Sequence, residues 1–210
     1  MELNEGVSEL IGALIGDGYI YRKNRKYQIG YVGSPITDKE YFEKIKILIA
    51  QEWNKDVKVR FRERGLRIVF NSKELCSFLI EGLGIPHGEG KCERVKIPNK
   101  IASDWSLAKY AIRGIFDTDG SVFVAKKPGI EKYPSIELTT TSKGLAFQVR
   151  DLLIKQGFRV ANIWQSKSIS STRIAYRVPL NGKNNIKMWV DKIGFSNPYK
   201  MQRALDYIKN

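Results

Sequence analysis

A short apolar phrase that ends in Asp-Gly occurs twice in this chain of 210 residues. The sequence reads LIGALIGDG at residues 10–18 and IRGIFDTDG at residues 112–120, which places Asp119 at a distance of 102 residues from Asp17. Other stretches repeat in the same order with small gaps; TDKEYFEKIKILIAQEW, for example, parallels TSKGLAFQVRDLLIKQGF. A repeat of this length indicates a tandem duplication, so the fold has to be built from two similar halves.

The later parts of each copy can be aligned as well. RIVFNSKEL parallels RVPLNGKNN, which pairs Asn71 with Asn181 and also pairs the lysines two positions further on. LGIPHGEGK parallels IGFSNPYK, which pairs Lys91 with Lys200. The duplication therefore extends over essentially the whole chain.

Each copy shows the same succession of patterns. A helix leads to Asp-Gly, over about residues 4–17 and 103–119, with Ser103 or Asp104 as the second N-cap. Two alternating strands, an amphipathic helix, two further strands and a closing helix follow. The prediction is an α+β fold of two pseudo-symmetric αββαββα units, each with a curved antiparallel sheet, packed through the two phrase helices. The first unit covers residues 1–97, a linker residues 98–104, and the second unit residues 105–210.

The phrase helices carry small residues at helical spacing. Small side chains let two helices approach at backbone distance, which would offset the roughly 1 kcal/mol that each glycine costs inside a helix. The glycine of each Asp-Gly pair is expected to end its helix with a positive φ. The predicted helix interface consists of Gly12, Ala13, Gly16, Gly114 and Thr118.

Two such helices lying side by side would bring Asp17 and Asp119 together at their C-terminal ends. Carboxylates and backbone carbonyls are oxygen ligands suited to Mg²⁺, and the negative end of each helix adds to the attraction. Metal ions held there could activate water and stabilise a leaving oxygen in phosphodiester cleavage. The expected ligands are both carboxylates with the carbonyls of Gly16 and Thr118, and Mn²⁺ is expected to replace Mg²⁺.

The net charge of the chain indicates which class of partner it binds. Lys and Arg number 36 against 22 Asp and Glu, a formal charge of +14 that favours nucleic acid or an anionic membrane. No apolar run of 18 residues and no secretory signal pattern are present, so a membrane is not expected as partner. The two cysteines form no metal-binding spacing, and with His87 as the one histidine any chemistry has to use carboxylates, lysines and metal ions.

Both phrases resemble the motif of the LAGLIDADG homing endonucleases of the single-chain, two-motif type. The resemblance covers essentially the whole chain, and the penultimate acid of the motif falls on Asp17 and Asp119. The first copy departs from the family phrase at Ile15, where the second copy keeps an acid, Asp117. Asp117 is interpreted as a helix-end or supporting carboxylate and not as a primary ligand.

The family also implies that basic residues near the scissile phosphates assist the reaction. Lys91 and Lys200, which the repeat places in equivalent positions, are the candidates for polarising water or stabilising the phosphorane, with Lys96 as the alternative in the first half.

The family further implies two saddle-shaped sheets in the major groove of DNA. Alternation in VKVRFRERG puts its basic residues on one strand face, and the second copy has fewer arginines, which would suit a non-palindromic site. The predicted DNA contacts are, in the first copy, Tyr19, Tyr21, Lys23, Arg25, Gln28, Ser34, Lys58, Arg60, Arg62, Arg64 and Arg67, and in the second copy Ser121, Phe123, Lys127, Glu137, Thr139, Thr141, Asn162, Trp164, Arg173 and Arg177.

The resulting expectation is a monomeric, intron-encoded endonuclease that cuts double-stranded DNA at a long site. A monomer follows because the second copy takes the place of a partner subunit. Its expected location is the cytoplasm, at the nucleoid, or an organelle of a eukaryotic host. The alternative is a maturase that binds intron RNA with the same fold, with or without nuclease activity; a non-catalytic DNA-binding regulator is a third class.

Overall fold

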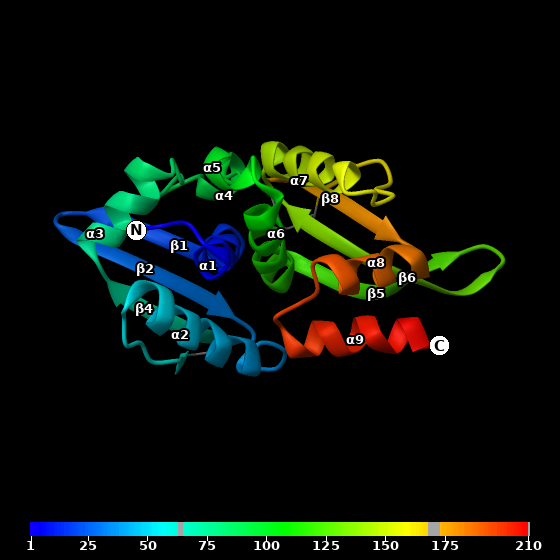
Figure 1. Ribbon diagram of the computed structural model, residues 1–210, viewed down its shortest axis with the longest axis horizontal. Helices are drawn as coiled ribbons and strands as arrows, with labels where there is room; N and C mark the ends of the chain where they lie inside the picture. Colours follow the sequence, from blue (N-terminus) through cyan, green and yellow to red (C-terminus); the bar gives the residue numbers. More distant parts are fainter. Residues whose placement is uncertain (63–64, 168–172, 210) are drawn as a thin grey trace.

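The computed structural model describes residues 1–62, 65–167 and 173–209, and for residues 127, 131 and 132 the backbone alone. The first half begins with one long helix and continues into a sheet with helices packed against it (Figure 1). Its elements are α1 (Glu5–Ile15), β1 (Gly18–Lys23), β2 (Lys26–Gly33), α2 (Lys39–Trp53), β3 (Arg60–Arg62), β4 (Gly65–Asn71), α3 (Lys73–Ser77), the π-helical turn η1 (Phe78–Gly82) and α4 (Lys91–Arg94).

The second half repeats this order after the short helix α5 (Asn99–Ala102), which lies within the predicted linker. Its elements are α6 (Trp105–Asp119), β5 (Gly120–Lys127), β6 (Ile130–Thr140), α7 (Lys143–Lys155), β7 (Trp164–Lys167), β8 (Ile174–Asn181), α8 (Lys183–Lys192) and α9 (Pro198–Lys209). The Asp104 side chain accepts a hydrogen bond from the backbone N–H of Ser106 and so caps α6. The two halves confirm the predicted α+β fold of paired αββαββα units.

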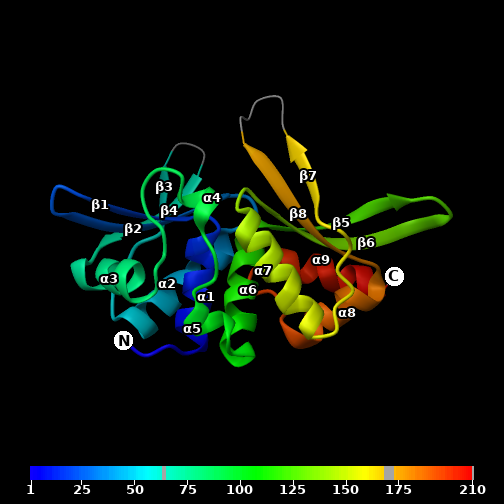
Figure 2. The same ribbon diagram turned by 90° about the horizontal axis from the view of Figure 1, so that it is seen from above.

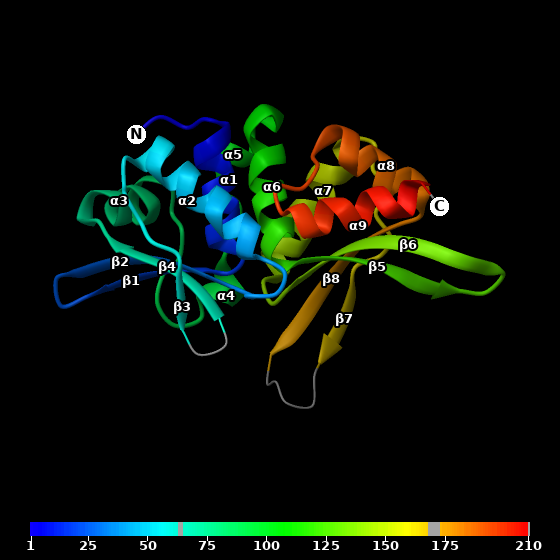
Figure 3. The same ribbon diagram turned by 90° about the horizontal axis from the view of Figure 1, so that it is seen from below.

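The two sheets have the same topology. The strand orders are β1-β2-β4-β3 and β5-β6-β8-β7, each four-stranded with antiparallel neighbours. Alternation puts Ile20, Ile29 and Ile68 on the face that the helices of the first half cover. Figure 3 shows the helices gathered on one side of both sheets, with the other side left open. We call this open side the outer face.

The helices α1 and α6 lie side by side between the halves (Figure 2). Their backbones touch, because a Cβ atom on Gly12 would overlap the carbonyl of Ala111, and one on Gly114 would overlap the carbonyl of Glu9 and the backbone N of Ala13. Gly16 packs against the side chain of Thr118, because a Cβ atom on Gly16 would overlap Thr118 Oγ1. The residues predicted for the helix interface thus all lie between these two helices.

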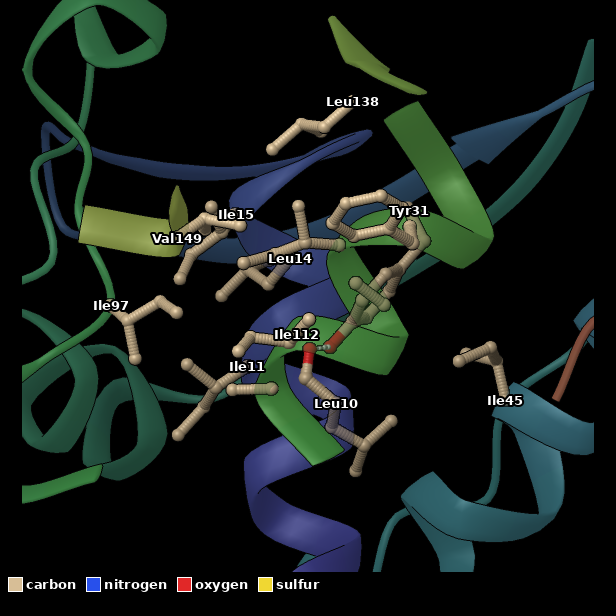
Figure 4. Packing of buried hydrophobic residues seen from close by; sticks show 14 of the residues in the cluster. Leu10, Ile11, Leu14, Ile15, Tyr31, Ile45, Ile97, Ile112, Leu138 and Val149 are labelled. Carbon is tan, nitrogen blue, oxygen red and sulfur yellow. Dashed lines mark hydrogen bonds between the residues drawn. The ribbon is translucent and has the colours of Figure 1, made fainter. Parts of the chain in front are cut away.

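Buried side chains from both halves converge on this pair (Figure 4). Leu14 and Ile112 lie between elements of the two units, and the Tyr31 hydroxyl donates a 3.2 Å hydrogen bond to the carbonyl of Leu10. Among the described residues an ion pair crosses the interface of these two helices, where the half-buried Arg113 guanidinium donates to Oε2 of buried Glu9. The core is therefore continuous through the helix pair. Among the described residues, no helix has the length and apolar character needed to cross a bilayer.

The prediction of a positive φ at the Asp-Gly glycines is wrong. Gly120 has φ −83° and ψ 152°, an extended conformation, and neither it nor Gly18 belongs to the glycines with positive φ. Both instead begin a strand directly after the helix turn. A Cβ atom on Gly18 would lie 2.5 Å from the Cα of Leu14, and one on Gly120 would overlap the Phe116 carbonyl. Close approach to the preceding helical turn is thus the reason for glycine here.

Two further expectations need correction. The strand expected over VKVRFRERG is shorter, since β3 covers only Arg60–Arg62, with Lys58 exposed ahead of it and Arg64 outside the described residues. The second half ends in α9, a helix of 12 residues that was not predicted; its counterpart after the first half, α4, has only 4 residues.

Candidate active site

The C-terminal ends of α1 and α6 bring the two motif acids together. Asp17 follows α1 in a turn, and Asp119 is the last residue of α6. The close packing at Gly16 makes this possible, because a Cβ atom there would lie 3.3 Å from Asp119 Oδ2. Asp119 is half-buried and Asp17 reaches solvent, so the pair lies at the surface between the two sheets.

Electrostatics at this pair disfavour two uncompensated charges. Burial raises the pKa of Asp119 to about 7, and the neighbouring charge of Asp17 adds to this increase. Partial burial among the helix ends also raises the pKa of Asp17. Lys91 and Lys200 act in the opposite direction on both pKa values. Two close carboxylates with raised pKa values are therefore a site where an additional cation would be stabilising.

Each motif helix is capped by one lysine. Lys91, from α4, donates from Nζ to the carbonyls of Leu14 at 2.5 Å, Ile15 at 3.1 Å and Gly18 at 2.6 Å. An ammonium group has three N–H donors, so these contacts use all of them, at the end of the helix where a positive charge is favourable.

Lys200, from α9, caps α6 in the same way. Its Nζ donates to the carbonyls of Phe116 at 2.9 Å, Asp117 at 2.7 Å and Thr118 at 2.9 Å. The two lysines that the repeat pairs are thus structurally equivalent, and both point at backbone oxygens. Lys96, the alternative in the first half, lies with its side chain over Gly144 at the start of α7.

This geometry gives a prediction for the lysines. Lys200→Met keeps the apolar stem but leaves three carbonyls without their charged donor, and we expect a loss of about 2–4 kcal/mol in the free energy of unfolding. Lys91→Met should behave alike, and strand cleavage should fall with stability because the acids lose their support. Thermal denaturation measures this, with Lys96→Met, on an exposed side chain, as the control. If a variant keeps its stability but loses cleavage, the lysine would instead act directly at the scissile phosphate.

The outer face of the first sheet carries most of the first-copy residues that are predicted to contact DNA. Tyr19, Tyr21 and Lys23 alternate with buried Ile20 and so lie on this face. The Tyr19 ring covers Gly30, and its hydroxyl donates to Gln28 Oε1 at 3.1 Å.

The basic residues of β3 and β4 lie on the same face. Arg60 pairs directly with Arg67 across the two strands, and Arg62 shares the face with Arg60. Arg25 is exposed in the β1–β2 turn at φ 61°. Ser34 differs, because its hydroxyl oxygen accepts from the N–H of Ile36 within the loop that leads to α2.

The outer face of the second sheet centres on Arg177. Its guanidinium donates to buried Glu137 at 2.8 Å and to Ser166 Oγ at 3.1 Å, and it lies 4.8 Å from the Trp164 ring centre. Thr139 pairs directly with Arg177 across β6 and β8. This arginine is therefore held in place before any partner binds.

The other predicted contacts of this half have varied surroundings. Ser121 and Phe123 lie on the outer face of β5, opposite Glu137 and Ser135. Arg173 forms a 2.7 Å ion pair with Glu93, and the Thr141 hydroxyl donates to the carbonyl of Cys92, so both connect this sheet to α4. Asn162 is exposed just before β7, and Lys127 ends β5 with its side chain outside the described part.

Comparison with known proteins decides the family. Residues 106–194, which include the second motif helix and Asp119, match the family model of the LAGLIDADG-like domain. The second half of the chain belongs to the LAGLIDADG-like domain family. The first half of the chain carries the first copy of the motif and the same sheet topology.

Solved structures share this LAGLIDADG fold over nearly the whole chain. Variants of the homing endonuclease I-DmoI match with a TM-score of 0.64 and 18% identity, covering 98% of this chain and 99% of that chain. I-DmoI in complex with DNA and Mn gives 0.60 and 17%, over 90% and 96%. The homing endonuclease I-WcaI bound to its DNA recognition sequence gives 0.63 and 17%, over 96% and 88%.

Curated relatives are much longer than this chain. The replication factor C small subunit of Methanocaldococcus jannaschii is 30% identical over 212 residues, which cover 100% of this chain and 10% of that protein. The tRNA-splicing ligase RtcB of Pyrococcus furiosus is 23% identical over 217 residues, covering 95% and 22%. The chain spans between a tenth and about a fifth of these two relatives.

The extra acid in the second LAGLIDADG motif turns inward. Asp117 is buried, and its two oxygens accept from the backbone N–H groups of Ser196 and Asn197, each at 3.0 Å. Burial raises its pKa to about 7. It therefore holds the loop that leads into α9 and so supports the placement of Lys200. The first motif has Ile15 at this position, buried in the core.

Sequence reasoning missed Asp38 at this site. Asp38 accepts from Asn197 Nδ2 at 2.9 Å across the two halves, and its charge contributes to the raised pKa of Asp17. It lines a cavity of about 260 Å³ together with Thr118, Lys200 and Arg203. The available signal was the repeat itself, since TDK at residues 37–39 aligns with TSK at 141–143.

The donor set fits a divalent metal ion. Asp17 and Asp119 supply two close carboxylates whose mutual repulsion a cation would relieve, and carboxylate oxygens are ligands that Mg²⁺ accepts. Thr118 O already accepts from Lys200 but keeps a second lone pair, as does any carbonyl oxygen. A Cβ atom on Gly16 would lie 3.3 Å from Asp119 Oδ2, so the end of α1 is close to this carboxylate; the carbonyls of Gly16 and Thr118 stay predicted ligands.

Proposed function

We propose that this protein is a site-specific homing endonuclease that cuts both strands of double-stranded DNA. The observation that carries the proposal is the meeting of Asp17 and Asp119 at the ends of α1 and α6, between two open, basic sheet faces. Each acid serves one strand. The support from known proteins is the shared fold with I-DmoI and I-WcaI, whose structures hold DNA.

The outer faces bind the duplex, and the acids lie where its two backbones pass between the sheets. The arginines of β3 and β4 attract phosphates or bind guanine edges in the major groove. Bound Mg²⁺, with Mn²⁺ as a substitute, supplies water activation and stabilisation of the leaving oxygen. Asp17 and Asp119 would hold the ions, with the carbonyls of Gly16 and Thr118 as the further predicted ligands, and at least two ions would suit a cut in each strand. I-DmoI structures obtained with Mn and with Mg support this choice.

The two lysines position the helix ends. Because each ammonium is bonded to three carbonyls, it fixes the last turn from which a motif acid projects. Their positive charges also lower the pKa of the acids toward the ionised, metal-binding form.

The two halves read different sequences. The outer face of the first half presents Arg60, Arg62 and Arg67, whereas that of the second centres on Arg177 with Glu137 as its partner. Different side chains at equivalent places suit a non-palindromic target. Because both halves belong to one chain, a monomer is sufficient for both cuts.

The long relatives bear on where such a nuclease is encoded. The matching segment is a small part of a replication factor C subunit and of an RNA ligase, which are proteins of different kinds. We infer that the segment is separable from the activity of either protein, as expected of a mobile nuclease. An intron-encoded origin stays a prediction, and a position within a longer polypeptide is its alternative.

The decisive experiment is cleavage of a randomised DNA library by the purified protein. We expect cuts in both strands at one long, non-palindromic site with Mg²⁺ or Mn²⁺, and none after EDTA treatment. With Ca²⁺, binding without cutting is expected. Binding without cutting in every metal would contradict the nuclease and favour a regulator, and binding of intron RNA in place of DNA would favour a maturase.

A further inference from the structure

Two concavities lie at matching places in the two halves. The first has a volume of about 700 Å³ and lies where β4 leads into α3, with Asn71 and Lys73 in its wall. The second has a volume of about 560 Å³ and lies where β8 leads into α8, with Asn181 and Lys183 in its wall. The repeat pairs these asparagines and these lysines with each other, and the contacts described above use none of the four.

Strand register shows that the match is structural as well. Asn71 pairs with Gln28, which pairs with Tyr21, four residues beyond Asp17. In the second half the same position, Asn181, pairs with Ser135, which pairs with Phe123, four residues beyond Asp119. Each concavity therefore starts at the same distance from its own motif acid.

Both concavities are basic. Arg25, Lys26 and Lys73 line the first, and Arg159 and Lys183 line the second. No acidic side chain belongs to either wall among the residues that the structure describes. Lysines and arginines with amide and tyrosine groups, and without a carboxylate, suit a phosphate diester.

The positions agree with the dimensions of DNA. A strand rises by about 3.4 Å per residue, close to the rise of about 3.4 Å per base pair along the axis of a DNA duplex. The four to six residues from Asp17 to the far end of β1 therefore correspond to roughly four to six base pairs outward from the cleavage centre. The concavities would lie over the flanks of a target centred on the motif acids.

We propose that these concavities are two matched clamps for backbone phosphates of the DNA flanks, with Lys73 and Lys183 as their central cations. The proposal rests on the proposed function, because it needs a duplex lying along both outer faces. The clamps act independently of base sequence. They align both ends of the duplex so that the two scissile phosphates lie over the motif acids.

The test measures how the binding constant for a 30-base-pair duplex of arbitrary sequence depends on salt concentration. Fluorescence anisotropy reports the binding, and Ca²⁺ is present. Each of Lys73→Gln and Lys183→Gln should reduce the slope of log K against log salt by about one. Between 50 and 200 mM salt, the wild type then loses about fourfold more affinity than either variant, and about sixteenfold more than the double variant. Lys39→Gln and Lys187→Gln, on exposed lysines outside both walls, are the charge-matched controls.

The outcomes separate this proposal from the nuclease itself. Slopes that fall for the clamp variants and not for the controls support the clamps. A wild type that binds DNA with a steep slope, together with clamp variants identical to the controls, overturns the clamps and leaves the nuclease standing. If the wild type binds no duplex, both the clamps and the proposed nuclease function are overturned. In a fourth outcome, inorganic phosphate stabilises the wild type against heat but not the clamp variants, while the salt slope of DNA binding is unchanged. This outcome would assign the concavities to a free anion and also overturn the proposal.

Discussion

Asp119→Asn is expected to convert a double-strand cut into a nick, with cleavage of one DNA strand slowed by at least about 10²-fold. The amide keeps the size of the carboxylate and removes the charge that would hold a metal ion. Asp17→Asn should give the complementary nick if, as we propose, each acid serves its own strand. Sequencing gels with the two DNA strands labelled separately distinguish the variants, and binding in Ca²⁺ should persist in both.

A stability measurement controls for misfolding. The folded protein holds a proton on Asp119 up to about pH 7, whereas a free side chain releases it near 3.8. The folded state therefore binds more protons than the unfolded state in this range, and the free energy of unfolding in EDTA should fall as pH rises from about 4 to 7. Asp119→Asn should weaken this pH dependence and be at least as stable as the wild type at pH 8. If Asp119→Asn is less stable than the wild type at pH 8, its loss of cutting would be explained by misfolding and not by the loss of a metal ligand.

Substitution of the interface glycines should have the largest effect on stability. A Cβ atom on Gly114 would overlap backbone atoms of α1, and backbone cannot move aside as a flexible side chain can. Gly114→Val should therefore cost at least about 3 kcal/mol, at the upper end of overpacking effects, which lowers Tm by roughly 6–12 °C in a chain of this length.

Gly82→Ala, at a glycine outside the helix interface, is the control for this prediction. A Cβ atom there meets only Phe78, at an ordinary 3.4 Å, so its Tm should change little. Calorimetry measures both variants. If Gly114→Val unfolds at the wild-type temperature, the two helices do not pack at backbone distance. Strand cutting should be lost in this variant because the motif acids separate with the helices.

The repeat made the centre of the molecule predictable. Small residues and an acid at the same spacing in both copies allow one arrangement in which two helices touch and their ends meet, so the placement of Gly12, Gly114 and both motif acids could be argued in advance. The same alignment paired Lys91 with Lys200. That their ammonium groups bond to helix carbonyls could not be predicted, because this depends on how α4 and α9 pack.

Other features of the fold were not predicted, because the packing of distant segments overrides the conformation that the local sequence favours. Gly18 and Gly120 were expected to end helices with a positive φ, yet a strand begins at each of them and requires extended backbone. The helix α9 has no counterpart of equal length in the first copy, so comparison of the copies concealed it. The contact from Asn197 to Asp38 joins residues 159 positions apart, and no local pattern signals such a pair.

The ion pair between Glu9 and Arg113 occurs once, although the fold is duplicated. The repeat places Ala111 where the second copy would need the glutamate, and Ile11 where the first would need the arginine. Two first halves facing each other would bury two glutamates against isoleucine, and two second halves would set two arginines against alanine. Each mismatched assembly would carry buried charge without compensation. The single ion pair thus makes the helix interface asymmetric. It favours packing of a first half against a second half over packing of either half against its own copy.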